Sequence, residues 1–329
     1  MTNPPALAPT EPARPDGSTA GRPDHPTRAR LGRRAGGTVG ADSREMVRLR
    51  RFMLTPMTVI LLGLTAFPFA YSLWISLTDR TASASGDFVG LRNYTDLFGS
   101  AQFWHALRLT LVFCVVAVAA QLVLGFLVAL GLNGLRREHR VLRAALILPM
   151  AATPVAVLFG WKVLLDPSQG VVNWLLGEVG LPQPDWLGTP TMAMVTMIVV
   201  DVWMWTPFVM VILLGALSGL PAESVEAAHV DGANWAQRLR YVVLPHIKPF
   251  LMLAVLFRGI DSLKAFDSFQ VLTAGGPGDA TTTLNMLAYR TGLQFLDFGK
   301  GAAVSTLLLI VAIVFGKVFM RFMRREARA

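Results

Sequence analysis

Long apolar runs separated by short polar segments dominate the chain. The expected membrane spans are residues 52–77, 109–132, 141–165, 191–217, 249–272 and 302–320. Each is long enough for a helix to cross ~30 Å of hydrocarbon. A helix is the expected conformation because it satisfies its own backbone hydrogen bonds in lipid. The pattern therefore predicts an all-α polytopic membrane protein with six transmembrane helices.

Composition supports this class and separates one region from the rest. Hydrophobic residues make up 53% and charged residues 16% of the chain, and the mean hydropathy is +0.50. These values are too apolar for an ordinary soluble protein. Residues 1–46 differ, because they are rich in Pro, Gly, Arg and small polar residues and lack helical periodicity. We expect them to form a disordered cytoplasmic tail, and residues 47–329 to form the transmembrane domain.

The positive charges indicate the orientation in the membrane. Of the 30 Lys and Arg residues, ten precede the first span, four lie between the second span and residue 143, three lie in segment 221–248 and five follow residue 316. Cytoplasmic flanks of membrane spans carry such an excess. Both termini and segment 221–248 are therefore expected in the cytoplasm. Because the net charge of +9 follows from these flanks, a nucleic-acid partner is not expected.

The fifth span is the weakest, because Arg258, Asp261, Lys264 and Asp267 interrupt it. Their signs alternate at i, i+3 spacing, so that on a continuous helix each side chain would neutralise the next. Charged residues at membrane depth normally face a bundle interior or an aqueous cavity. Two interpretations stay open. The four residues line a translocation pathway or gate, or they belong to a self-neutralised structural helix near the outer interface.

A polar segment, residues 221–249, connects the fourth and fifth spans. Pro221 suits the first position of a helix, so a short helix is expected over residues 222–230. Asp231-Gly232 is a turn signal, since glycine tolerates a positive φ. The segment is predicted to be a helix-turn-helix.

The second helix of this segment carries its own start and stop signals. Asn234 is a candidate N-cap, and Gln237 three residues later is its capping-box partner. Leu244-Pro245 is expected to close the helix, because proline lacks a backbone N–H. Two alanines in the first helix would let a partner approach closely. On these features alone the segment is either a docking element or a solvated loop.

Catalytic motifs are missing from the sequence. It has no G-x-x-x-x-G-K-[ST] phosphate loop, so the chain is not expected to hydrolyse nucleotide itself. It has no H-E-x-x-H or G-x-S-x-G motif, and its five histidines are scattered, which argues against a catalytic metal. Cys114 is the only cysteine and is expected to be a buried structural thiol. An intramembrane enzyme stays as a distant alternative.

The polar segment resembles the signature loop of permeases from binding-protein-dependent ATP-binding-cassette (ABC) importers. That signature reads EAA, three residues, G, nine residues, I, one residue, LP. Every spacing is kept here, and the one departure is valine for isoleucine. The matching residues are Glu226, Ala227, Ala228, Gly232, Val242, Leu244 and Pro245.

Other stretches resemble the carbohydrate-uptake permeases, most closely the first permease of maltose- and glycerol-phosphate-type systems. One departure is Leu109, where the family usually has asparagine. The resemblance covers about residues 52–325. The stretches that carry it are Phe88–Tyr94, Asp201–Trp203 with Trp205–Phe208, and Leu272–Gly278.

This resemblance implies a type I ABC importer permease fold in a bacterial plasma membrane, in contact with membrane lipid. The chain would pair with a second, related permease to form the translocation pore for a sugar. A cytosolic ATPase dimer would dock beneath the pair, and an extracytoplasmic solute-binding protein would deliver the sugar. ATP would be used by the ATPase, so this chain itself is expected to bind no cofactor.

The same resemblance assigns the polar segment to ATPase coupling. Glu226 would supply an acidic contact, the alanines would permit close seating, and Gly232 would make the turn. The residues expected to take part are Glu226, Ala227, Ala228, Asp231, Gly232, Leu244 and Pro245.

Two alternatives remain. The first is a permease of the same family for glycerol phosphate or another small solute, for which Arg258 or Lys264 would offer a cation. The neighbouring aspartates argue against a net positive pocket. The second is a secondary carrier that works without an ATPase.

Overall fold

The computed structural model describes residues 39–133 and 140–326. Helices dominate these residues, and extended pairing within them is limited to two isolated bridges, Thr78 with Phe88 and Thr81 with Asp297. The predicted all-α class is confirmed. The elements are α1 (Val39–Ile75), α2 (Arg92–Gly99), α3 (Ala101–Asn133), α4 (Arg140–Ala151), α5 (Pro154–Leu164), α6 (Val171–Glu178), α7 (Pro190–Ser218), α8 (Ala222–Val230), α9 (Trp235–Arg238), the π-helix η2 (Leu239–Val243), α10 (Leu244–Leu263), α11 (Asp267–Leu272), α12 (Leu284–Tyr289), the π-helix η3 (Arg290–Gln294) and α13 (Phe298–Glu326).

Within the described residues, five helical segments are long and apolar enough to cross a membrane. A bent pair, Ala144–Ala151 with Pro154–Leu164, makes a sixth crossing if it is counted as one span. The five segments are Arg51–Ile75, Ala101–Asn133, Pro190–Ser218, Trp235–Leu263 and Phe298–Arg325.

The third expected span is not one continuous helix. The chain bends by 99° between α4 and α5. Thr153 at the break is extended, with ψ of 119°, and Pro154 begins α5. A residue before proline avoids the α conformation because the proline ring would clash with it, and proline has no N–H to continue the ladder. The expectation of an unbroken helix over residues 141–165 was therefore wrong.

The fifth expected span is also interrupted. The helical segment Trp235–Leu263 ends with Lys264 at its C-cap, and α11 begins again at Asp267. Arg258 and Asp261 thus lie on α10, Lys264 lies in the break, and Asp267 begins α11. The expectation that they form one continuous i, i+3 ladder was wrong.

The described chain divides by its contacts into two units, and the boundary at Gly63–Leu64 falls inside α1. The expected disordered tail lies outside the described residues as far as residue 38. Residues 39–46, which we assigned to the tail, already belong to α1. Extending an existing helix costs far less than starting one, which accounts for this longer helix.

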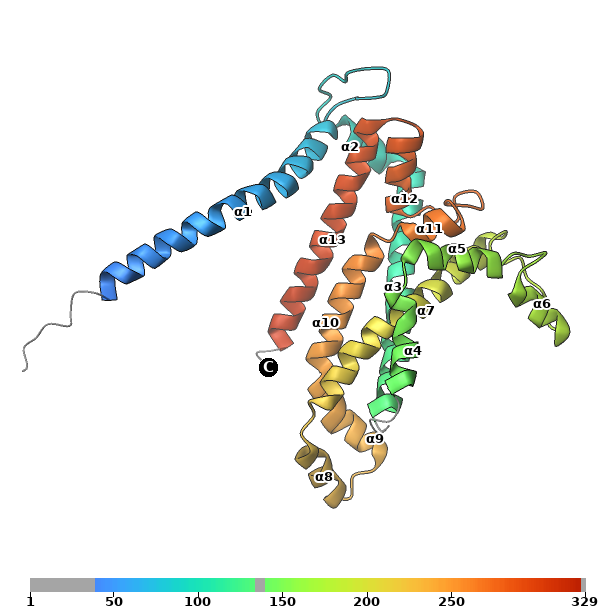
Figure 1. Ribbon diagram of the computed structural model, residues 1–329. Coiled ribbons are helices and arrows are strands. Elements are labelled where there is room, and N and C mark those ends of the chain that lie inside the picture. Colours follow the sequence, from blue (N-terminus) through green and yellow to red (C-terminus); the bar gives the residue numbers. More distant parts are fainter. Residues whose placement is uncertain (1–38, 134–139, 327–329) are drawn as a thin grey trace, which may run out of the picture. The chain divides into compact units, whose positions relative to one another are not determined.

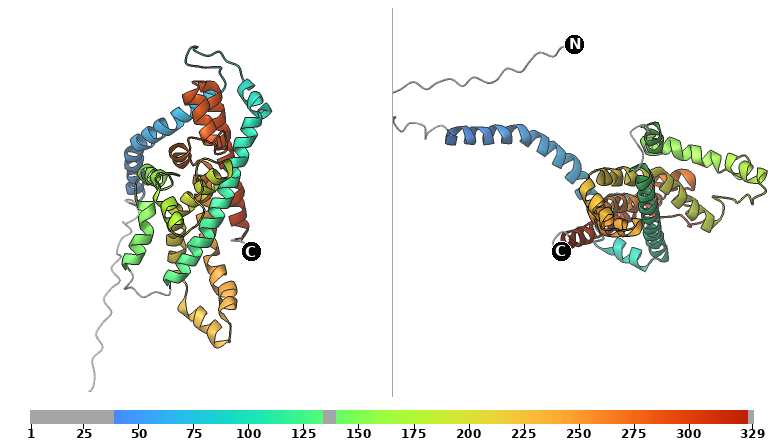
Figure 2. Two further views of the ribbon diagram at one scale, coloured as in Figure 1. Left: turned by 90° about the vertical axis from the view of Figure 1, so that its right-hand side faces the viewer. Right: turned by 90° about the horizontal axis from the view of Figure 1, so that it is seen from below.

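In the second unit, α3 and α7 form the most extensive helix pair, and α10 packs against both and against α13 (Figure 1, Figure 2). Gly125 of α3 allows the close approach, since a Cβ there would overlap the side chain of Val209 on α7. The connection α8–α9 lies at one end of this unit, and α12 with the start of α13 lies at the other (Figure 1).

Candidate functional site

The polar segment between α7 and α10 folds as the predicted helix-turn-helix. Asn234 Oδ1 accepts from the backbone N–H of Gln237 at 2.9 Å, and Gln237 Oε1 accepts from the backbone N–H of Asn234 at 2.8 Å. The predicted capping box is confirmed. Gly232 has a φ of +78°, in the left-handed region that favours glycine. The backbone N–H of Asp231 closes α8 on the carbonyl of Ala227 at 2.9 Å.

The second helix of this segment does not stop at Leu244-Pro245. It continues through the π-helical turn η2 into α10, and both residues lie in the first turn of that helix. A π-turn accommodates the N–H that Pro245 lacks without ending the helix. The expected break there was wrong, and the segment is joined rigidly to the fifth span.

The surface of the helix-turn-helix is open and carries apolar groups. No residue of α8 is buried, and Glu226 is exposed. The exposed fractions of Val230, Trp235 and Tyr241 are 86%, 64% and 69%. Large apolar side chains exposed on a polar segment mark a binding surface for another protein. Sequence reasoning did not single out these three residues, although an aromatic residue beside an N-cap was a usable signal.

A second polar group lies inside the helix bundle around Arg258. This side chain is 2% exposed, and its Nη2 donates to Asp201 Oδ2 on α7 at 3.0 Å. Its Nε donates to Gln121 Oε1 on α3 at 2.8 Å, and its Nη1 pairs with Asp261 on α10. The guanidinium also lies over the ring of Trp205, 4.7 Å from the centroid. We call these five residues the Arg258 cluster.

The cluster joins three membrane-spanning helices through one buried cation. Gln121 Nε2 donates to Asp201 Oδ2 at 2.7 Å, so the carboxylate has two side-chain donors. A charge in a low-dielectric interior is tolerated only when it is paired and hydrogen-bonded. Sequence reasoning missed Asp201 and Gln121 as partners, although both are polar residues within apolar runs.

The four predicted pathway residues are only partly brought together. Arg258 and Asp261 form an ion pair. Lys264 and Asp267 are exposed, and no ion pair joins either of them to the cluster within the described residues. All four nevertheless line one polar pocket of about 190 Å³.

An adjoining pocket of about 420 Å³ shares Trp205, Arg258, Asp261 and Lys264 with the first. Its remaining walls are apolar and mostly aromatic, from Phe208, Phe257 and Ile260. We call the two together the Arg258 pocket. Aromatic faces beside a few charged and hydrogen-bonding groups are the usual lining of a site for a small polar molecule.

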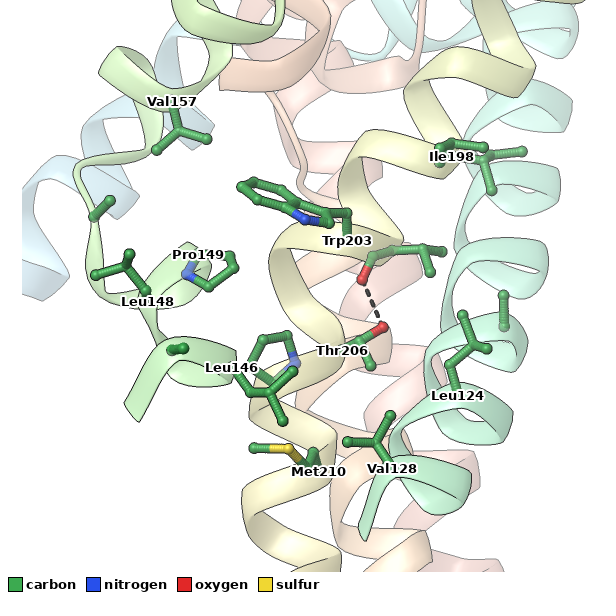
Figure 3. Close-up of a pocket in the computed structure, with 16 residues that line it drawn as sticks. Leu124, Val128, Leu146, Leu148, Pro149, Val157, Ile198, Trp203, Thr206 and Met210 are labelled. Atoms are coloured by element: carbon green, nitrogen blue, oxygen red, sulfur yellow. Dashed lines mark hydrogen bonds between the residues drawn. The ribbon is translucent and has the colours of Figure 1, made fainter. Parts of the chain in front are cut away.

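A larger pocket, of about 910 Å³, lies between α3, α4 and α7 (Figure 3). Its walls are leucine, isoleucine, valine, alanine, proline and methionine side chains with Trp203. The hydroxyl of Thr206, its only hydroxyl group, donates back to the carbonyl of Val202 at 2.6 Å (Figure 3). A polar solute would lose its hydrogen bonds to water here without replacement. The Arg258 pocket is therefore the candidate solute site, although it is smaller. Among the described residues, no three His, Cys, Asp or Glu side chains are placed to share a metal ion.

Comparison with known proteins gives consistent matches over most of the chain. Residues 121–328 match the family model described as "Binding-protein-dependent transport system inner membrane component". The probable ABC transporter permease protein y4oQ of Sinorhizobium fredii is 39% identical over 84% of this chain and 91% of its own length. The trehalose/maltose transport system permease protein MalF of Thermococcus litoralis is 36% identical over 83% and 93%.

One solved structure extends the match to the fold. A chain from a bacterial alginate ABC transporter, in complex with an alginate pentasaccharide-bound periplasmic protein, superposes with a TM-score of 0.76. The match covers 86% of this chain and 96% of that chain at 23% sequence identity, so that it concerns the fold alone.

Proposed function

The chain belongs to the family of binding-protein-dependent transport system inner membrane components, and from this membership we propose that it is the permease subunit of an ATP-driven sugar importer. The observation that carries the proposal is the exposed helix-turn-helix between α7 and α10, with the signature spacing from Glu226 to Pro245. Such a surface is suited to bind a separate ATPase, since the sequence has no phosphate-loop motif of its own.

In this proposal the ATPase binds the α8–α9 surface. Ala227 and Ala228 allow close seating, Glu226 supplies an acidic contact, and the positive φ of Gly232 sets the angle between the helices. Leu244 and Pro245 would transmit movement rather than absorb it, because η2 and α10 are continuous there. Asp231 is exposed at the end of α8, beside the same surface.

Movement of this surface would reach the Arg258 pocket directly. The helix that begins at Trp235 ends at Leu263, and Arg258 lies in its last part. Because Arg258 also bonds to α7 and α3, tilting α10 changes the cluster geometry. Packed helices of this kind move as rigid bodies between discrete arrangements. Alternating access of the pocket follows from that movement.

The lining of the Arg258 pocket favours a neutral sugar. Trp205, Phe208 and Phe257 offer aromatic faces, whose negative potential attracts the C–H groups of a sugar ring. Asp261 and Lys264 offer an acceptor and a donor for hydroxyl groups. Glycerol phosphate is a weaker candidate, because Arg258 is already paired with two carboxylates.

The partners follow from the same proposal. They are a second homologous permease, a cytosolic ATPase dimer, an extracytoplasmic solute-binding protein and the sugar. The first two relatives are named as an ABC transporter permease and a trehalose/maltose permease, and the alginate transporter structure includes a periplasmic protein. The chain would sit in a bacterial plasma membrane, with both termini and the α8–α9 surface in the cytoplasm.

Reconstitution in proteoliposomes tests this function. The complete complex should accumulate at least one sugar from a panel of radiolabelled glucose, trehalose, maltose and maltotriose, and only with ATP and the binding protein present. Transport by this chain without the ATPase would establish a secondary carrier and contradict the proposal.

A further inference from the structure

A further pocket, of about 730 Å³, lies between the last turns of α1 and the elements α12, η3 and α13. All of its lining residues belong to the second unit. Its size lies within the ~300–1,000 Å³ that is common for small-molecule sites. We call it the Tyr289 pocket.

Aromatic rings from two parts of the chain form its walls. Phe67 and Tyr71 of α1 stack with centroids 6.0 Å apart and planes 10° apart. Tyr289 of α12 meets Phe266, with centroids 5.0 Å apart and planes at 57°. Such rings present flat, electron-rich faces, against which the C–H face of a sugar ring packs favourably.

Polar groups stand among these rings. Arg80 Nη1 donates to the hydroxyl of Tyr71 at 3.0 Å, which leaves its other N–H groups free to serve a ligand. Asn285 Nδ2 donates to the carbonyl of Lys264 at 2.6 Å, which leaves its Oδ1 as an acceptor. Arg80 is the only charged residue in the lining. The mixture fits a hydroxyl-rich neutral molecule better than an acyl chain.

Backbone contacts and one ion pair fix the side of the pocket that η3, α13 and Arg80 form. Gly301 of α13 lies against Gly292 of η3, and a Cβ on Gly301 would overlap the Gly292 backbone. Arg290 at the start of η3 is held by Asp279, with Nη1 to Oδ1 at 2.7 Å. The carbonyl of Arg80 accepts from the backbone N–H of Gly299 at 3.0 Å. This side of the pocket is therefore preformed.

The Tyr289 pocket adjoins the Arg258 pocket. Phe266 lines both pockets. Asn285 of the Tyr289 pocket donates a hydrogen bond to the backbone carbonyl of Lys264, a residue of the Arg258 pocket. Resting on the proposed function, we propose that the Tyr289 pocket binds one unit of an oligosaccharide while a neighbouring unit occupies the Arg258 pocket. The transported sugar then has at least two units.

Occupancy is tested by thiol protection in the complete complex with its binding protein. Cys114 is the only cysteine, so Cys114→Ala gives a cysteine-free chain in which Ser72→Cys reports on the Tyr289 pocket. The transported sugar of two or more units should slow the reaction with a methanethiosulfonate reagent at position 72 at least fivefold. The control Ser83→Cys, exposed and outside the pocket, should show no protection.

Uptake supplies the second measurement. Tyr289→Ala should lower uptake of the same sugar about fivefold or more through loss of one stacking contact. Tyr289→Phe, which keeps the ring, should stay within about twofold of the unmodified complex. Phe295→Ala, an exposed aromatic residue outside the lining, should leave uptake unchanged.

Three outcomes overturn this inference and leave the proposed function standing. In the first, the sugar does not protect position 72 and Tyr289→Ala takes up sugar normally. In the second, glucose is the only sugar of the panel that is transported. In the third, a change of phospholipid composition restores uptake by Tyr289→Ala. The last would make the pocket a lipid site. A complex that transports no sugar of the panel contradicts the proposed function itself.

Discussion

Arg258 on α10 links this helix to α3 and α7 through buried side-chain hydrogen bonds. Its partners Asp201 and Gln121 are as buried as it is, with exposed fractions of 6% and 0%. Removing one member of a buried ion pair leaves the other charge unpaired, which costs about 3–5 kcal/mol. Loss of any one of these three side chains should therefore destabilise the bundle.

We expect Arg258→Ala to lower the free energy of unfolding by that amount. The measurement is the melting midpoint of the detergent-solubilised complex, which should fall. Lys264→Ala is the control, because Lys264 is exposed and its stability effect should fall within about ±0.5 kcal/mol. Equal melting points for the two variants would show that Arg258 is not a structural cation.

Gly232 provides the second prediction on this scale. Its φ of +78° makes alanine unfavourable by about 1 kcal/mol and proline incompatible. Gly180 has a φ of +71° and, like Gly232, open space around its Cβ position, so that Gly180→Ala is a matched control. Gly232→Ala should reduce sugar uptake per ATP hydrolysed and Gly232→Pro should abolish uptake, whereas Gly180→Ala should change neither. Membrane insertion should be normal in all three, as measured by the amount of protein in membranes.

Local features were predictable residue by residue, but tertiary pairings were not. Asn234 and Gln237 are three residues apart, so the capping box follows from sequence spacing alone. Asp201 and Gln121 lie 57 and 137 positions from Arg258. Only the packing of α3 and α7 brings them to it. The i, i+3 spacing identified Asp261 as a partner of Arg258, but it does not indicate the more buried partner, Asp201.

Two of the expected spans are interrupted, and their C-terminal parts pack on each other. α5 follows the break at Thr153, α11 follows the break after Leu263, and the two helices are in contact. Lys162 Nζ on α5 donates to the carbonyl of Val271 on α11 at 3.1 Å. Pro154 and Leu158 of α5 also line the Arg258 pocket. The paired segments α5 and α11 therefore border the candidate solute site.

The α4–α5 bend depends on Pro154 in this account. In a Cys114→Ala background, spin labels at Ala144→Cys and Val163→Cys report its angle, because both positions are exposed. Pro154→Ala should lengthen their separation toward the ~28 Å that nineteen residues of continuous helix span. Pro190→Ala, at the start of α7, is the control and should leave the distance unchanged. A distance that Pro154→Ala does not alter would assign the bend to packing rather than to proline.

The number and type of the spanning elements followed from apolar run length, but their continuity did not. Pro154 lies within an apolar run, where neighbouring helices often compensate for a proline, so the sequence did not distinguish a kink from a break. Lys264 likewise left open whether the fifth helix ends. The break after Leu263 is accompanied by packing of α11 on α5 and α7, and no sequence pattern contains those contacts.

On the scale of the whole molecule, the chain connects a polar surface to a polar pocket. The helical segment Trp235–Leu263 runs from the exposed α8–α9 surface to Arg258 and Asp261. The resemblance of the α8–α9 segment to a coupling loop was recognisable from spacing. The Tyr289 pocket was not, because its aromatic residues come from positions as distant as Phe67 and Tyr289.

We propose that the α8–α9 surface couples an external ATPase to sugar movement. The most direct test compares Glu226→Lys with Glu223→Lys in the reconstituted complex, because both reverse an exposed charge on α8. The quantity measured is sugar transported per ATP hydrolysed. Glu226→Lys should abolish uptake while the chain still inserts into the membrane, and Glu223→Lys should retain at least half of the normal ratio. Normal ATP-coupled uptake by Glu226→Lys would contradict this proposal.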